Sequence, residues 1–169
     1  MREAFTLAEI LVVIAIVVII GSIGLANYKV REKDILNWEA EKVANLLKQA
    51  QVYALQARMR ELEYETFRPY GYGVFFQSPS LYTFYSDQNE DFRYDEREKI
   101  IKYSLSQNII FGFEPVEENL DILFTLPGAR VYLNGRPVEY SIIITLKETT
   151  TQREKGVIIN PISQGIDIQ

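Results

Sequence analysis

The chain begins with a long run of apolar residues. From Phe5 to Ala26 there are 22 residues, and Glu9 is the only charged one. About 20 apolar residues in a helix, each rising about 1.5 Å, match the roughly 30 Å hydrocarbon core of a bilayer. The pattern therefore predicts a helix of transmembrane length over residues 5–28.

A second helical pattern follows, in which small or apolar residues recur at alternating spacings of four and three. This spacing places them on one face of a helix. It predicts one nearly continuous helix from about Phe5 to about Glu63, with the stripe packed on a sheet. A coiled coil is the other interpretation, but the many alanines and the β-rich remainder favour a sheet. The stripe consists of Leu36, Ala40, Val43, Leu47, Ala50, Ala54 and Ala57.

After Pro69 the pattern changes to short β-type runs, because proline and the nearby glycines end the helix. Asn134-Gly135, between two β-rich runs, is typical of a type I′ hairpin. Residues 29–169 are therefore predicted to form an α+β domain, a long helix packed on antiparallel sheets. The predicted strands are Tyr72–Phe76, Leu81–Tyr85, Lys99–Leu105, Ile109–Phe113 and Ile122–Leu126, with short strands in "GVIINP" and "GIDIQ".

Composition excludes several classes of function. The formal charge of −5 and the pI of about 4.9 argue against nucleic-acid binding, which needs basic surface to neutralise phosphates. The chain has no cysteine and no histidine, so Ser–His–Asp and thiol catalysis and the commonest transition-metal ligands are excluded. None of the 23 acids stands out by its spacing as a catalytic pair. We therefore expect no enzymatic activity, no cofactor apart from the calcium considered next, and no nucleic-acid partner.

One acidic stretch, "DQNEDFRYDERE", has the spacing of a calcium-binding loop. Oxygen ligands stand at positions 1, 3, 5, 9 and 12 of such a loop. The sixth position should be glycine, which allows the sharp turn, and here it is phenylalanine. A solvated connection between two strands is the alternative. The candidate ligands are Asp87, Asn89, Asp91, Asp95 and Glu98.

The N-terminal run "FTLAEILVVIAIVVIIG" resembles the signature of type IV prepilins and type II secretion pseudopilins. Phe5, Thr6, Leu7 and Glu9 stand in register with that signature, and the aliphatic run follows them. Three later segments, "GYGVFF", "LYTFYSD" and "GVIINPISQGIDI", resemble the H-type (FimT-like) minor pseudopilins. The resemblance implies a pilin-like fold and a structural role in a filament.

The resemblance also implies a processing reaction. A prepilin peptidase would cut between Ala4 and Phe5, release the leader of residues 1–4, and methylate the new amine. Glycine is usual before the cut in this family, and alanine stands there in this chain. The resemblance further implies that Glu9, at the place of the family's glutamate, pairs with the N-terminal amine of Phe5 on a neighbouring subunit. Two opposite charges that are each costly in an apolar filament core offset one another there.

The function implied by the resemblance is that of a minor pseudopilin in a type II secretion pseudopilus. The expected partners are other pilin or pseudopilin subunits, the prepilin peptidase and the inner membrane. The resemblance implies a single-pass inner-membrane protein with its leader in the cytoplasm and its globular domain outside, assembled in a filament. A minor pilin of a type IV or competence pilus is the first alternative.

A secreted soluble protein with a conventional signal peptide is the second alternative. Gly24-Leu25-Ala26 is a small-x-small site at the end of an apolar run, as signal cleavage requires. Against it stand the length of the run and the acid at Glu9. The two cases differ in the mature N-terminus, which is Phe5 for a pilin-like protein and Asn27 for a secreted one.

Overall fold

The computed structural model describes residues 7–56, 60–61, 66–77, 79–112 and 119–169. The chain divides into two compact units, Met1–Ile35 and Leu36–Gln169.

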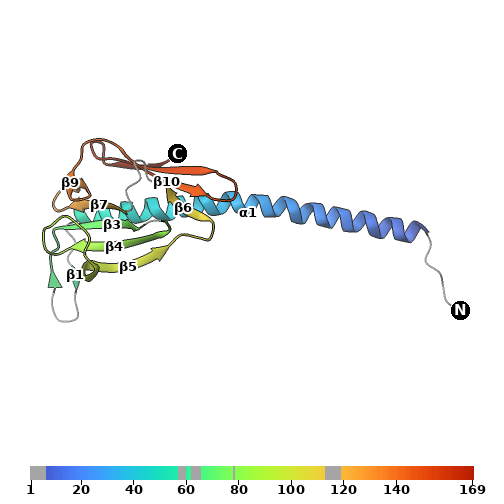
Figure 1. Ribbon diagram of the computed structural model, residues 1–169, viewed down its shortest axis with the longest axis horizontal. Helices are drawn as coiled ribbons and strands as arrows, with labels where there is room; N and C mark the ends of the chain where they lie inside the picture. Colours follow the sequence, from blue (N-terminus) through green and yellow to red (C-terminus); the bar gives the residue numbers. More distant parts are fainter. Residues whose placement is uncertain (1–6, 57–59, 62–65, 78, 113–118) are drawn as a thin grey trace. The chain divides into compact units, whose positions relative to one another are not determined.

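Two helical elements and twelve strands are formed by the described residues (Figure 1). The helices are α1 (Leu7–Leu55) and the 3-10 helix η1 (Glu96–Glu98). The strands are β1 (Arg60–Glu61), β2 (Thr66–Phe67), β3 (Gly71–Gln77), β4 (Leu81–Asp87), β5 (Lys99–Ser104), β6 (Ile109–Gly112), β7 (Asn119–Thr125), β8 (Arg130–Leu133), β9 (Arg136–Pro137), β10 (Ile142–Glu148), β11 (Glu154–Asn160) and β12 (Gly165–Ile168).

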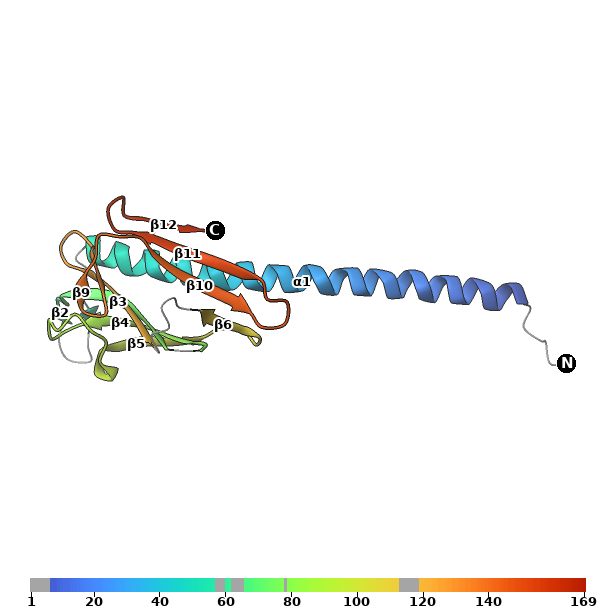
Figure 2. The same cartoon turned by 45° about the horizontal axis from the view of Figure 1, so that its top comes forward.

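The strands form two larger antiparallel sheets and one small hairpin. The six-stranded sheet has the order β5-β4-β3-β7-β8-β9, and the four-stranded sheet has the order β12-β11-β10-β6. β1 and β2 pair with each other. Figure 2 shows the two larger sheets along the C-terminal part of α1, which lies in the same compact unit. Buried residues from this part of α1 and from both larger sheets make up one core.

The predicted helical stripe is buried, as far as it is described. Leu36, Ala40, Val43, Leu47, Ala50 and Ala54 are all at most 3 % exposed, and Ala57 lies outside the described residues. The predicted helix end near Glu63 is wrong, because α1 ends at Leu55. Leu55 and Gln56 are exposed, so packing stabilises the helix little at this end, and an unpacked helix end is marginal in water.

The predicted fold class is also wrong. An α+β domain dominated by one long helix was expected, but more residues lie in strands than in helices, so the described chain is mostly β. Among the described residues of the unit Leu36–Gln169, the helical ones belong to α1, up to Leu55, and to the single turn η1. The helical stripe provides one face for the core, and the paired strands supply the rest.

The prediction of individual strands was more successful. Each predicted strand overlaps an observed one, and the hairpin at Asn134-Gly135 joins β8 to β9. Both turn residues have positive φ angles, 49° and 78°. A type I′ turn requires this conformation, and asparagine and glycine adopt it at little steric cost.

Candidate functional site

An exposed apolar segment of α1 is the first candidate site. Ten large aliphatic residues between Ile10 and Ile20 are each 50–64 % exposed. They surround the helix, whereas a helix at the surface of a globular protein normally exposes a polar face. Such a large apolar surface marks a place where another molecule binds. We call Ile10–Ile20 the apolar segment.

No helix formed by the described residues is both long enough and apolar enough to cross a membrane. This finding contradicts the predicted transmembrane helix and the predicted single-pass inner-membrane location.

Of the residues predicted for processing and for subunit pairing, the structure describes Glu9. Ala4 and Phe5 lie outside the described residues. Glu9 lies in the first turn of α1, two residues after its start at Leu7. A carboxylate in this turn interacts favourably with the partial positive charge of the helix N-terminus, at about 0.3–1 kcal/mol. Glu9 therefore has a local role available besides the predicted pairing with a neighbouring subunit.

The second candidate site is the acidic loop, Asp87–Glu98, which connects β4 to β5. The structure folds it around the buried carboxylate of Asp87. One oxygen accepts hydrogen bonds from the N–H groups of Asn89 (3.2 Å) and Glu90 (2.9 Å), and the other accepts one from Phe92 (3.3 Å). Burial raises the pKa of Asp87, and these three N–H donors oppose that shift. Asp87 thus acts as the internal support of the loop.

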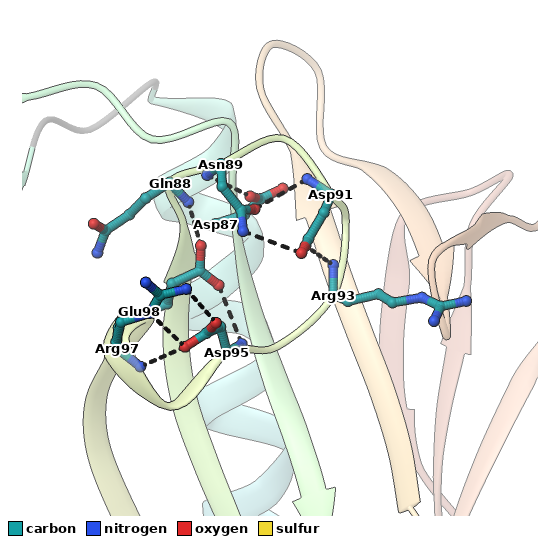
Figure 3. Close-up of polar contacts among 8 residues, drawn as sticks. All are labelled: Asp87, Gln88, Asn89, Asp91, Arg93, Asp95, Arg97 and Glu98. Atoms are coloured by element: carbon teal, nitrogen blue, oxygen red, sulfur yellow. Dashed lines mark hydrogen bonds and ion pairs between the residues drawn. The ribbon is translucent and has the colours of Figure 1, made fainter.

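Glu98 closes the other end of the acidic loop. Its Oε1 accepts a hydrogen bond from the N–H of Gln88 (2.8 Å), and its Oε2 accepts one from that of Asp95 (3.3 Å). Asp95 caps η1 and pairs with Arg97, which holds the pKa of Asp95 at about 2. Figure 3 shows this network, with the Arg93 side chain pointing away from it.

Aromatic stacking holds the acidic loop on the six-stranded sheet. Phe92 stacks on Tyr132 of β8, with ring centroids 4.6 Å apart, and Tyr94 stacks on Phe75 of β3 at 4.5 Å. These contacts form a small cluster of half-buried aromatic side chains beside the main core. Phe92, which stands where a calcium loop requires glycine, therefore packs against the sheet.

Sequence reasoning missed Asp121, the residue that joins the acidic loop to β7. It is 5 % exposed, and its two carboxylate oxygens accept hydrogen bonds from the Tyr85 hydroxyl and the Tyr94 N–H, both at 2.7 Å. Burial raises the pKa of Asp121 to about 6. A single acid inside the apolar run "LDILF" was the signal that could have identified it, since buried carboxylates need specific partners.

The pKa of Asp121 predicts a pH dependence of stability. A carboxyl group with a higher pKa in the folded chain than in the unfolded one stabilises the fold at low pH, and this contribution is lost as the pH rises through about 6. In the wild type, the free energy of unfolding should fall by up to about 3 kcal/mol between about pH 4 and 7. In Asp121→Asn this fall should be absent. The amide can still accept from Tyr94 and donate to the Tyr85 oxygen.

Urea denaturation at several pH values measures this effect as the difference between wild type and variant. Asp167→Asn, at an exposed position of β12, is the matched control and should keep the wild-type profile. If the free energies of unfolding of the wild type and of Asp121→Asn differ by the same amount at every pH, Asp121 does not titrate in this range.

The five predicted calcium ligands lie on one loop, but the loop's own N–H groups occupy their oxygens. In addition to the hydrogen bonds that Asp87 and Glu98 accept, Oδ1 of Asn89 accepts one from the Asp91 N–H group. Oδ1 of Asp91 likewise accepts one from the Arg93 N–H group. Among the described residues, no group of three or more acidic side chains is arranged to hold a metal ion. Calcium binding stays a prediction, and the geometry supports the alternative, a self-supported connection.

We therefore expect 1 mM calcium to leave the melting temperature of the wild-type chain unchanged within about a degree. A ligand that binds only the folded state raises stability by RT ln(1 + [L]/Kd), so even a millimolar site would give a measurable rise at higher calcium concentrations. Differential scanning calorimetry measures the change in melting temperature on addition of calcium, with magnesium as the control. A calcium-specific rise that disappears in Asp91→Asn would establish the site.

No family of known proteins, no curated protein and no solved structure matches this chain.

Proposed function

We propose that this chain is a minor pseudopilin, a structural subunit of a type II secretion pseudopilus that acts by assembly with other subunits. The observation that carries the proposal is the apolar segment, ten large aliphatic side chains that are at least half exposed on one helix. The signature residues Phe5, Thr6, Leu7 and Glu9 precede it in the order typical of the family.

The physical basis of assembly is the burial of this apolar surface. Transfer of one large aliphatic side chain out of water contributes about 1.5–3 kcal/mol. A bundle of such helices from several subunits buries the whole circumference of the apolar segment. The globular unit, Leu36–Gln169, then contacts the neighbouring subunits.

Cysteine cross-linking in cells tests the proposal directly, because the chain has no native cysteine. Ile16→Cys, in the middle of the apolar segment, should cross-link to co-encoded subunits that carry an apolar N-terminal helix of their own. Gln107→Cys, at an exposed position of the globular unit, is the matched control. Equal yields at both positions, or no partner with such a helix, would refute the proposal.

The mass of the mature chain separates the proposal from the secreted alternative. A pilin-like subunit begins at a methylated Phe5, whereas a conventionally secreted protein begins at Asn27. Intact-mass spectrometry of the chain purified from its host distinguishes the two, since they differ by 22 residues.

We expect no DNA binding, which separates the proposal from a DNA-uptake pilin. Each phosphate contact requires Lys or Arg, and the tail from Asn160 to Gln169 has neither. The only charged side chain there is that of Asp167, which is exposed. A mobility-shift assay at physiological salt should show no complex. A salt-sensitive shift that is lost on removal of Gln164–Gln169 would move the protein to the DNA-uptake class.

A further inference from the structure

A cavity of about 280 Å³ opens where three turns of the globular unit meet. Ala129, Val131 and Val138, which are at most 8 % exposed, form its apolar floor. Arg130 and Glu139 also line it, and both are exposed. The lining of the cavity therefore includes both apolar and polar groups, with one cation and one anion among them.

A protruding apolar side chain stands beside this cavity. Ile162, in the turn between β11 and β12, lines the cavity and is still 80 % exposed. This is the largest exposure of any large apolar side chain in the described part of the chain. Tyr140, next to Glu139 in sequence, is 63 % exposed. One face thus carries both a cavity and a side chain of the size that enters such cavities.

The turn that carries Ile162 is held in place by hydrogen bonds. Asn160 Oδ1 accepts bonds from the N–H groups of Ile162 (3.0 Å) and Ser163 (3.1 Å). Gln164 donates from Nε2 to the Gly128 carbonyl oxygen (3.1 Å), and its own carbonyl oxygen accepts a bond from Gln51 (3.0 Å). Little conformational entropy is then lost when Ile162 binds, which favours association.

This face carries one charge of each sign, on Arg130 and on Glu139. Arg130 and Glu139 form no side-chain ion pair with any described residue. In an interface with two-fold symmetry, residue i of one copy contacts residue j of the other, and j contacts i. Arg130 of each copy can therefore face Glu139 of the other copy.

We propose that this face, formed by the cavity, Ile162, Tyr140, Arg130 and Glu139, is a two-fold interface between two copies of this chain. Ile162 of each copy enters the cavity of the other, and the two Arg130–Glu139 pairs flank the contact. The inference is independent of the apolar segment and of the proposed function.

Disulfide formation by the full chain tests the interface, since the only thiols are those introduced. Ser163→Cys, next to Ile162, should give a disulfide-linked dimer, and Thr150→Cys, in the β10–β11 hairpin, should give at least tenfold less. Adding Ile162→Asp to Ser163→Cys should lower the dimer yield about tenfold or more, because truncating a central anchor commonly has this effect. Circular dichroism should show an unchanged fold, since Ile162 is exposed.

Charge exchange makes the test specific for the two-fold arrangement. In the Ser163→Cys background, Arg130→Glu alone and Glu139→Arg alone should each lower the yield, because each creates two like-charged pairs. A mixture of these two variants should form the mixed dimer, in which every pair is again of opposite charge. Failure of the mixture to recover the dimer, or equal yields from Ser163→Cys and Thr150→Cys, would overturn the proposal.

Discussion

Leu47→Asp should prevent the globular unit from folding. Leu47 is fully buried and belongs to the same core as Phe76 of β3 and Ile144 of β10. The substitution removes a large aliphatic side chain, which costs about 2–5 kcal/mol, and buries an unpaired carboxylate, which costs several more. Typical domains have only about 5–15 kcal/mol of stability, so the sum reaches the whole stability of the fold.

Near-UV circular dichroism and thermal melting measure the result, with Lys48→Asp as the matched control. Lys48 is the next residue along the helix and is exposed, so the same carboxylate remains hydrated there. The melting temperature of Leu47→Ala should lie between those of Leu47→Asp and Lys48→Asp, because this variant leaves a cavity but no buried charge. If Leu47→Asp melts within a degree or so of wild type, the stripe does not support the core.

The helical stripe could be predicted because a single periodicity determines it. Residues from Leu36 to Ala54 repeat at a spacing that only a helix places on one face, and all six described members are buried. The hairpin at Asn134-Gly135 could be predicted for the same reason, since two neighbouring residues that adopt positive φ angles determine the turn.

Features that depend on contacts far apart in sequence could not be predicted. The acidic loop is held by Asp121, which lies 27 residues after Tyr94 and on another strand. Gly73 looked like a simple helix breaker, but a Cβ there would lie 2.5 Å from the ring of Tyr85. The ring of Tyr85 requires this glycine, and the pairing of β3 with β4 creates the contact.

The fold class and the helix end were wrong for a related reason. Propensity favoured continuing the helix beyond Leu55, and no local signal before Pro69 stopped it. The structure ends α1 at Leu55, one residue after the buried Ala54, and pairs Arg60 with Phe67 in a short hairpin. Tertiary packing thus overrides a weak local preference.

Glu9→Val should abolish assembly of the chain into a filament while leaving its processing intact. In the proposed filament, the carboxylate of Glu9 pairs with the N-terminal amine of Phe5 on a neighbouring subunit. Removal of one partner leaves the other charge uncompensated in an apolar bundle, which costs about 3–5 kcal/mol when the pair is buried. The N-terminal mass should still show cleavage before Phe5, and cross-linking from Ile16→Cys should fall to the level of its control.

Glu9→Gln separates this pairing from the local role of Glu9 at the start of α1. Glutamine at the third helical position can still accept a hydrogen bond from the first turn, so it maintains the helix start but removes the charge. If the intersubunit pair matters, Glu9→Gln should fail to assemble as Glu9→Val does. If Glu9→Gln assembles normally, Glu9 acts only within its own helix. Ala8→Val, which adds apolar bulk beside Glu9 and keeps the charge, should assemble like wild type.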